Sequence, residues 1–435
     1  MTTMSAPMRD DYTELAHSPV PLLVTDVPGP RARVVIDRDQ HVTSPSIARV
    51  HPLVPARGAG CVIEDVDGNR FLDINAGIGV ASTGHCHPHV VEAIDRQARS
   101  LIHYCSSDWY IPAYTELCER LAAHAPVRGQ ARVFLGNSGT EAVEGAIKLA
   151  RHATARPNLI AFHGAFHGRS LGSLTLTASK ARYRGGFGPL LPGVFHAPYG
   201  DLDALELVFR HLTPPDDVAA IFVEPIQGEG GYVVPPEGWL AGLRALCDEH
   251  GILLVADEVQ TGVGRTGRMW AIEHESVEPD IIVAGKGIAS GLPLSAVIAR
   301  ADVMMWERGT HGSTFGGNPV ACAAALATLD LIESTLATNA ADTGAHLIAQ
   351  LRKSLMRHSQ VREIRGRGLM IGVDMIDGDA ALFVEQEAFR RGVIALTAGP
   401  STVRLAPPLV ITPDQGDIAA GVLDDVVGAL AQART

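Results

Sequence analysis

The chain has 435 residues, of which 46% are hydrophobic and 19% are charged, and its formal net charge is −12. A chain of this length forms more than one structural unit, and this composition is typical of a soluble globular protein. The negative charge argues against nucleic acid or an anionic membrane as a partner, although a local positive pocket could still bind a small anion.

The six cysteines are scattered along the chain, and the sequence contains no C-x-x-C pair. We therefore expect no zinc or dithiol site and predict no bound metal, and the cysteine usage favours a reduced, cytoplasmic compartment. The sequence has no uninterrupted apolar stretch long enough to cross a bilayer, and its polar, acidic N-terminus does not resemble a signal peptide. These observations predict a protein that does not associate with membranes.

The N-terminal region begins with residues 1–50, which are rich in Pro, Arg and Asp and show little periodicity, so we expect an extended arm there. The segment GCVIEDVDGNRFLDINAG at 60–77 predicts a β-hairpin, with CVIEDV and RFLDI as its strands and DGN as its turn. We assign residues 1–75 to an arm and hairpin that pack with the small domain.

Strands and helices alternate along the central part of the chain. The clearest strand-containing segments are 131–151, 158–168, 218–231, 243–262 and 279–287. This alternation predicts a largely parallel sheet with helices on both faces, in a large domain at 76–325. A long helical stretch then leads into residues 326–435, which we assign to a smaller α+β domain.

Lys286 is the most informative single residue, because it follows the apolar run IIVA and lies between Gly285 and Gly287. Most lysines near strand ends are solvated and have no further role. Alternatively, an amine in a partly dry pocket loses its proton more easily and can attack a carbonyl to form a Schiff base. The flanking glycines would let a flat ligand approach the backbone.

The loop GNSGTEA offers a possible anion site, because Ser138, Gly139 and Thr140 immediately precede a predicted helix. Ligands of open parallel sheets bind beyond the carboxyl ends of the strands, and free N–H groups at a helix N-terminus attract phosphate. The simpler interpretation is an ordinary helix cap with Thr140 as the cap residue.

Other chemical groups follow neighbouring predicted strands. Asp257 ends one strand, where a protonated ring nitrogen would be a suitable partner for its carboxylate, while Glu258 should point to the opposite side of the extended chain. Gln260 could bond a ring oxygen, and Phe166 could either stack on a flat ring or pack in the core. An anion cradle, an acid, an aromatic platform and an amine together describe a site for pyridoxal 5′-phosphate (PLP), which would act as an electron sink.

The sequence resembles the class III (ornithine/GABA-type) PLP-dependent aminotransferases of PLP fold type I. The resemblance is carried by motifs in the family's order: GNSGTEAVEGAIKLAR, AFHGR, VEPIQGEGG, ADEVQTGVGRTG, GKGIASGLPLSAV, STFGGNP, RGRGLM and VRLAPPL. It implies an α/β fold, in which a mainly parallel seven-stranded sheet carries helices on both faces and a smaller α+β domain follows.

The resemblance also implies roles for the cofactor residues. Lys286 would be the Schiff-base lysine and Asp257 the partner of the pyridine nitrogen, and these two are the predicted catalytic residues. Thr314 would reach the phosphate of the neighbouring subunit, which implies a homodimer or a dimer of dimers. The complete predicted cofactor-binding set is Ser138, Gly139, Thr140, Phe166, Asp257, Val259, Gln260, Lys286 and Thr314.

Four further residues resemble the family's substrate contacts. Arg404 would bind an α-carboxylate, Glu229 would cover that arginine when no α-carboxylate is present, and Arg169 would bind the distal carboxylate. Ile78 would form an apolar wall. An ordinary ion-pair network is the alternative for the charged residues.

The implied reaction is transfer of an amino group from an ω-amino acid to 2-oxoglutarate. The apolar Ile78 favours 4-aminobutyrate as the donor, with ornithine or acetylornithine as other candidates. A PLP-dependent amino-acid racemase or epimerase of the same family is the alternative, because both reactions begin with removal of a proton from the bound amino acid. A non-catalytic scaffold fits poorly with the presence of both Lys286 and Asp257.

Overall fold

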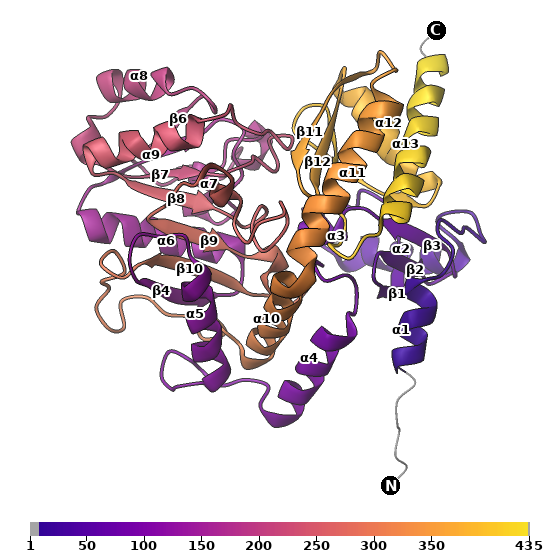
Figure 1. Cartoon of the computed structure of the whole chain (residues 1–435), viewed down its shortest axis with the longest axis horizontal. Coiled ribbons are helices and arrows are strands. Elements are labelled where there is room, and N and C mark those ends of the chain that lie inside the picture. Colours follow the sequence, from indigo (N-terminus) through magenta and orange to yellow (C-terminus); the bar gives the residue numbers. More distant parts are fainter. Residues whose placement is uncertain (1–7, 434–435) are drawn as a thin grey trace.

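A seven-stranded sheet forms the centre of the larger half of the protein in the computed structural model, which describes residues 8–433 (Figure 1). The strand order is β4-β10-β9-β8-β7-β5-β6. Four neighbouring pairs are parallel, and only β10 runs antiparallel to its two neighbours among the described strands. The predicted mainly parallel sheet is therefore confirmed. The strands are β4 (Ala131–Gly136), β5 (Asn158–Phe162), β6 (Val194–Ala197), β7 (Val218–Val223), β8 (Leu253–Asp257), β9 (Ile281–Ala284) and β10 (Ser295–Arg300).

Helices cover both faces of this sheet, as the sequence predicts. Every residue of β7 is buried, and its side chains are divided between two apolar clusters. Phe222 packs in the cluster that contains the buried face of α6, whereas Ile221 packs in the cluster that contains α9. The helices of this half are α4 (Pro88–Ser100), α5 (Pro112–His124), α6 (Gly139–Thr154), α7 (Leu171–Leu176), α8 (Asp203–His211) and α9 (Trp239–His250), and short 3-10 turns occur at Ala181–Tyr183, Pro215–Asp217, Ala271–Glu275 and Lys286–Ala289.

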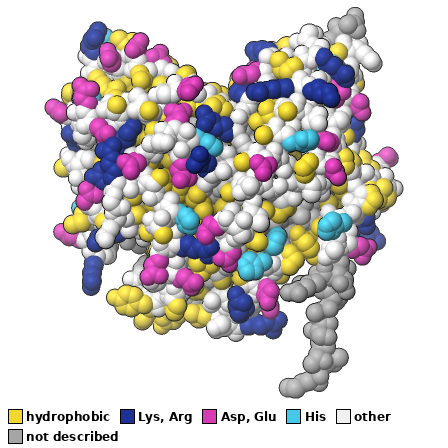
Figure 2. Space-filling view, viewed as in Figure 1, with side chains coloured by type: hydrophobic (Ala, Val, Ile, Leu, Met, Phe, Trp, Pro, Cys, Tyr) yellow, Lys and Arg dark blue, Asp and Glu magenta, His cyan; other side chains and the backbone are white. Residues whose placement is uncertain are grey.

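A four-stranded antiparallel sheet, ordered β11-β12-β15-β14, forms the second, smaller half. Helices α11 and α12 pack on this sheet and α13 packs on these two helices, which gives the predicted α+β unit (Figure 1). A notch separates the two halves at the top of the view in Figure 2. The elements are α11 (Ala337–Leu355), β11 (Val361–Arg367), β12 (Met370–Met375), α12 (Gly378–Arg390), β14 (Leu396–Ala398), β15 (Thr402–Leu405) and α13 (Pro413–Ala433).

One long helix connects the two halves. It begins as α10 (Pro319–Leu331), passes through a π-helical segment (Ile332–Leu336) and continues as α11. The predicted boundary near residue 325 falls inside α10, so the division into 1–75, 76–325 and 326–435 remains a prediction. Contrary to the expectation from the sequence, the helix Pro319–Leu355 contains an 18-residue window that is apolar enough to cross a membrane by length and composition, and half of that window is buried inside the protein.

The N-terminal region differs from the extended arm expected from the sequence. Within its described part it forms two helices, α1 (Met8–Ala16) and α2 (Pro30–Val42), while residues 1–7 lie outside the described residues. The start of α2 is stabilised from a distance, because the carboxylate of Asp67 accepts the backbone N–H groups of Arg31 and Ala32, both at 2.9 Å. A helix whose N-terminus is capped by a distant residue leaves little local signal in the sequence.

The predicted hairpin is present and pairs with a strand from the C-terminal part of the chain. Strands β1 (Pro55–Ala59), β2 (Val62–Asp65) and β3 (Arg70–Asp73) are antiparallel neighbours, and β3 also pairs in parallel with β13 (Val393–Ile394). A short turn, α3 (Ala76–Gly79), follows β3 and contacts the 3-10 turn that begins at Lys286.

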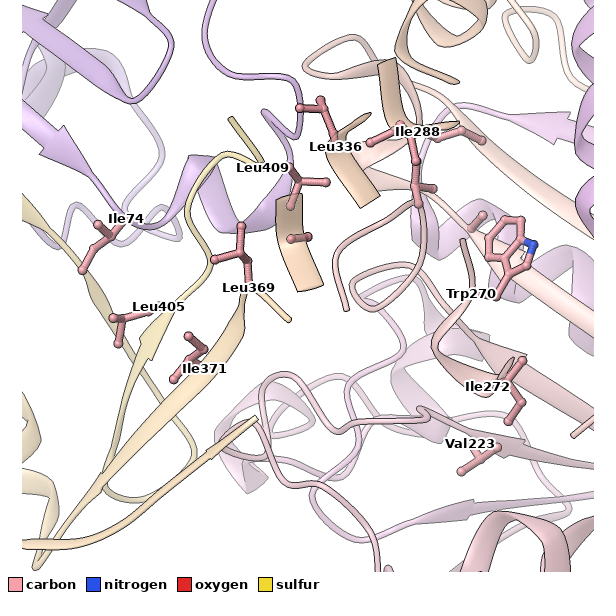
Figure 3. Packing of buried hydrophobic residues seen from close by; sticks show 14 of the residues in the cluster. Ile74, Val223, Trp270, Ile272, Ile288, Leu336, Leu369, Ile371, Leu405 and Leu409 are labelled. Carbon is pink, nitrogen blue, oxygen red and sulfur yellow. The ribbon is translucent and has the colours of Figure 1, made fainter. Parts of the chain in front are cut away.

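A continuous apolar core holds the two halves together (Figure 3). Ile288 lies in the turn after β9, Leu336 ends the π-helical segment, and Leu369, Leu405 and Leu409 come from the smaller half. All are at most 7% exposed, so this contact excludes water. Because close-packed cores resist displacement, the core fixes β15 relative to the carboxyl end of β9.

Candidate active site

Lys286 begins the 3-10 turn at the carboxyl end of β9 and has a left-handed backbone conformation, with φ 42°. The following residue must be small, because a Cβ atom on Gly287 would lie 2.4 Å from the Ser82 hydroxyl oxygen. Burial lowers the pKa of the Lys286 amine to about 8, and the positive charge of Arg404 acts in the same direction. A larger fraction of this amine is therefore neutral and nucleophilic near neutral pH than for a free lysine.

Asp257 ends β8 and is paired with a histidine. Its Oδ2 atom lies 2.6 Å from Nδ1 of His167, and both side chains are almost completely buried. Burial opposes the charged form of His167, but the hydrogen bond and negative charge of Asp257 outweigh this effect and raise the pKa of His167. Glu258 points to the other side, as expected, where it accepts the backbone N–H groups of Ala271 and Ile272.

Glu224 is a buried acid at this site to which the sequence interpretation gave no role. Its two carboxylate oxygens accept the backbone N–H groups of Phe166 and Gly228, each at 2.9 Å, and so tie two site loops together. Burial raises the pKa of Glu224 to about 7, although the positive charge of His167 opposes this rise. The position of Glu224 directly after a buried strand is a sequence signal for a site residue. Its role was missed because the two loops that it joins, those of Phe166 and Gly228, are far apart in the sequence.

The predicted anion site lies at the N-terminus of α6. Ser138, rather than Thr140, is the cap residue, since its side chain accepts the backbone N–H of Glu141. The Thr140 hydroxyl instead lies 2.6 Å from the hydroxyls of both Ser170 and Ser173. The interpretation of Thr140 as a cap is therefore wrong, because its side chain contacts the loop that follows β5.

Val259 and Gln260 lie in the loop after β8. A Cβ atom on Gly139 would come within 2.9 Å of Val259, so the glycine allows this side chain to pack against the start of α6. Gln260 is buried, and its carbonyl oxygen accepts a hydrogen bond of 2.8 Å from Tyr232.

Glu229 and Arg404 form a direct ion pair across the two halves of the protein. The Arg404 side chain is only 5% exposed and that of Glu229 is 16% exposed, so the pair is largely removed from water. Burial would raise the pKa of Glu229, but the charge and hydrogen bond of Arg404 lower it overall. The positive charge of Lys180 acts in the same direction, which identifies Lys180 as a nearby cation that the sequence interpretation missed.

Phe166 and Arg169 lie on the loop after β5, beside an aromatic residue from the 3-10 turn at Ala181–Tyr183. The guanidinium carbon of Arg169 lies 5.0 Å from the ring centre of Tyr183 and 5.8 Å from that of Phe166. Arg169 is exposed and forms no ion pair with any residue in the range 12–432. Its guanidinium therefore remains available to an anion.

Ile78 occupies a strained position. It lies in a turn where Ala76, Gly77, Ile78 and Gly79 all have positive φ angles, and its own φ is 69°. A β-branched residue rarely adopts this conformation, which commonly marks functional sites when the surrounding structure enforces it. Asp73 enforces it here, because its carboxylate accepts the backbone N–H groups that begin the turn.

Thr314 is exposed on the loop that precedes α10. The neighbouring Ser313 hydroxyl lies 3.3 Å from the side-chain nitrogen of Asn137, so this loop contacts the loop that begins α6.

The structure brings together the central charged residues of the prediction. Asp257, Glu229 and Arg404 all act electrostatically on the Lys286 amine, although they come from different segments of the chain. Ile78 lies in a turn that contacts the 3-10 turn of Lys286. Arg169 and Thr314 lie farther out, on exposed loops.

Comparison with known proteins identifies relatives along almost the whole chain. The family model described as aminotransferase class-III matches residues 44–427. The chain is 45% identical to the acetylornithine aminotransferase of Methanopyrus kandleri, over 92% of this chain and 99% of the relative. It is 39% identical to the 4-aminobutyrate aminotransferase of Mycobacterium tuberculosis, over 93% of this chain and 98% of the relative.

Two further relatives bear on the reaction and on the cofactor. The chain is 39% identical to an alanine/serine racemase of Pyrococcus horikoshii, over 94% of this chain and 92% of the relative. An ornithine aminotransferase structure from Toxoplasma gondii, described with PLP at its active site, superposes with a TM-score of 0.86. It is 34% identical and covers 99% of both chains.

The lowered pKa of Lys286 can be tested by chemical labelling. In the cofactor-free protein, the rate at which an amine-reactive aryl fluoride modifies Lys286 should be half-maximal near pH 8, because only the neutral amine reacts. Peptide mass spectrometry would measure the rate at each pH. Added PLP should protect Lys286 but not the exposed Lys353, and equal labelling of both residues with and without PLP would contradict the assignment.

Proposed function

Because this chain belongs to the class III aminotransferases, which are PLP-dependent enzymes, we propose that it transfers an amino group from an ω-amino acid of the 4-aminobutyrate type to 2-oxoglutarate. Ornithine and acetylornithine are the other donors supported by the names of the relatives. The apolar Ile78 favours a donor with a short carbon chain over one with a second ammonium group.

The Glu229–Arg404 pair carries this proposal. A buried arginine is suited to bind a carboxylate by two hydrogen bonds, but it is costly to leave it unpaired. An ω-amino acid has no carboxylate next to its amino group, so Glu229 would remain on Arg404 while this donor reacts. The α-carboxylate of 2-oxoglutarate would displace Glu229 and take its place, which lets one pocket accept two unlike substrates.

The residues of the site fit PLP. Lys286 offers a partly neutral amine, Asp257 a buried carboxylate, and the N-terminus of α6 a set of N–H groups for a phosphate. Val259 presents an apolar surface against Gly139, where a side chain on residue 139 would clash. When bound, PLP supplies an aldehyde for the amine and a ring that accepts electrons from the substrate.

Each catalytic residue then has a defined task. The Asp257 carboxylate would hold a proton on the ring nitrogen, and its hydrogen bond with His167 fixes its orientation. The Lys286 amine would take a proton from the substrate carbon that bears the amino group and deliver it to the cofactor carbon. Phe166 would cover one ring face, and Gln260 would donate a hydrogen bond to the ring oxygen.

The outer residues would select the substrates. Arg169 is exposed and would bind the carboxylate at the far end of the donor or of 2-oxoglutarate. Lys180 lies near Glu229 and adds positive charge to the same region. Ser138, Gly139 and Thr140 would bind the phosphate of the cofactor.

We propose that the enzyme is a homodimer, or a dimer of dimers, in which Thr314 of one subunit reaches the phosphate site of the other. An apolar surface beside Thr314 supports this proposal. We call it the loop patch, and its exposed members are Leu101, Ile102, Tyr104, Trp109, Tyr110 and Phe315. Hydrophobic side chains gather at the lower left edge in Figure 2, near the lower end of α5 in Figure 1. Exposed patches of this kind commonly mark protein interfaces.

A cytoplasmic location is also proposed. All six cysteines are free thiols, which fits a reducing compartment. Recovery of the native protein in an oxidising compartment after cell fractionation would contradict this location.

Similarity to the alanine/serine racemase favours a second candidate function. In a racemase, the abstracted proton returns to the same substrate carbon, rather than to the cofactor carbon, and no amino acceptor is consumed. The same lysine and cofactor would begin either reaction, so the two functions differ in where the proton goes.

The two functions make opposite predictions for the wild-type enzyme. We expect glutamate to form from 4-aminobutyrate and 2-oxoglutarate, measured by chromatography, and no glutamate to form without the donor. Incubation of L-alanine or L-serine without an acceptor should leave its chirality unchanged. Formation of the D-isomer, together with no reaction of any ω-amino acid, would replace the aminotransferase proposal by the racemase.

The variant Glu229→Ala tests how the pocket distinguishes its substrates. It should slow the reaction of the ω-amino acid with the cofactor by about 10-fold or more, because Arg404 would be left buried and unpaired. It should leave the reaction of glutamate equal or faster, because no carboxylate has to be displaced. Single-turnover absorbance measures the two half-reactions separately. Glu278→Ala, which removes an exposed partner of Arg128, is a matched control that should affect neither. Equal slowing of both half-reactions in Glu229→Ala would reduce Glu229 to a structural role.

The oligomeric state can be tested at the loop patch. Sedimentation should give the mass of two or four chains for the wild type, and Tyr110→Asp should shift the mass towards one chain, because Tyr110 is 98% exposed in the single chain. Leu382→Asp on α12 is the control, since Leu382 is also exposed but lies outside the loop patch. A fully active wild-type monomer would exclude the proposed sharing of the phosphate site.

A further inference from the structure

Tyr232 is a completely buried tyrosine in an unusual backbone conformation, with φ 53°. Large residues seldom adopt positive φ angles, so this position must be enforced by its surroundings. It follows the Glu229 loop and lies against β12, where a Cβ atom on Gly372 would come within 3.1 Å of the Tyr232 side chain. A glycine in the opposite strand therefore makes room for this tyrosine.

Arg365 of β11 holds this conformation from the smaller half of the protein. Its Nε atom donates to the backbone carbonyls of Gly231 and Tyr232, each at 3.2 Å, and its Nη2 atom donates to Gly231 at 2.7 Å. Nη2 also donates to the Thr402 hydroxyl at 3.0 Å. A planar guanidinium with several fixed donors is well suited to hold two successive carbonyls.

The Tyr232 hydroxyl donates to the carbonyl oxygen of Gln260 at 2.8 Å. The amide nitrogen of Gln260 lies next to Gly228, where an added Cβ atom would be only 2.4 Å away. This nitrogen makes no hydrogen bond with any group in the described part of the chain. Gln260 retains 8% of its surface exposure, so its side chain is not wholly enclosed by protein.

Nearby charges favour this direction of the hydrogen bond. Burial dominates and raises the pKa of Tyr232, while the positive charges of Arg404 and Arg265 act in the opposite direction. The negative charge of Glu229 also acts on the phenol, but Glu229 is itself paired with Arg404. A hydroxyl beside cations turns its oxygen towards them and its hydrogen away. The hydrogen then points to Gln260, whose carbonyl must face the tyrosine and whose NH₂ group must face the other way.

We propose that Tyr232 is a positioning residue that orients the Gln260 amide so that its NH₂ group donates to the ring oxygen of PLP. This inference rests on the proposed function, and it adds a residue that does not itself touch the cofactor. Without the tyrosine hydroxyl, the Gln260 amide could rotate and present its carbonyl oxygen to the negatively charged ring oxygen.

The orientation has a consequence that spectroscopy can detect. A hydrogen bond to the ring oxygen stabilises its negative charge and thereby favours the deprotonated form of the lysine-bound cofactor. Loss of this bond should raise the pKa of the bound cofactor. The net free energy of one hydrogen bond corresponds to a pKa shift of about half a unit to one unit.

The experiment is a pH titration of the visible absorbance of the PLP-loaded enzyme without substrate. Tyr232→Phe removes one oxygen atom and should raise the titration midpoint by about half a unit to one unit. Gln260→Leu removes the donor and should raise the midpoint at least as much. Tyr114→Phe is the matched control, because the Tyr114 hydroxyl accepts the backbone N–H of Leu135 in β4 and should not influence the midpoint. Thermal melts would verify that each variant is folded.

Three outcomes would overturn the inference. An unchanged midpoint in Tyr232→Phe beside a raised one in Gln260→Leu would mean that Tyr232 does not orient the amide. An unchanged midpoint in Gln260→Leu would mean that the amide does not reach the ring oxygen. An equal shift in Tyr114→Phe would show that the effect is not specific to Tyr232. Failure of the wild type to bind PLP would be a different result, because it contradicts the proposed function itself.

Discussion

A buried arginine needs a negative partner, and the arrangement of this site follows from that requirement. Arg404 projects from β15 of the smaller half into a region where water is largely excluded, and Glu229 from the larger half neutralises it. The pair therefore does more than connect two surfaces. In the proposed reaction, Arg404 would bind the α-carboxylate of one substrate, and Glu229 would pair with Arg404 while a substrate without an α-carboxylate is bound.

The same charges influence the reactive amine. Arg404 opposes protonation of Lys286, while Glu229, Glu224 and Asp257 favour it, and burial decides the balance. Displacement of Glu229 by a substrate carboxylate would exchange one negative charge for another, so the electrostatic environment of Lys286 would be nearly preserved.

Some residues around these groups have strained backbone conformations. Lys286, Ile78 and Tyr232 all have positive φ angles, although none of them is a glycine. Each is held by contacts from elsewhere: Ile78 by the Asp73 carboxylate, Tyr232 by Arg365, and the Lys286 turn by the adjacent α3. Strained residues persist only where the surrounding packing determines their conformation. The apolar core between the two halves provides that rigidity (Figure 3).

The sequence by itself determined the features that are local along the chain. Buried strands of apolar residues such as β7 and β9, the alternation of strand and helix, and the ordered family motifs predicted the fold, and the period of two in β8 sent Asp257 and Glu258 to opposite sides. Tertiary structure alone decided the features that depend on residues far apart in sequence. The N-terminal segment forms α2 because Asp67 caps it, His167 reaches Asp257 across 90 positions, and Tyr232 is held by Arg365 from the other half. The physical reason is that hydrogen bonds and ion pairs depend on distance in space, whereas the sequence reports only distance along the chain.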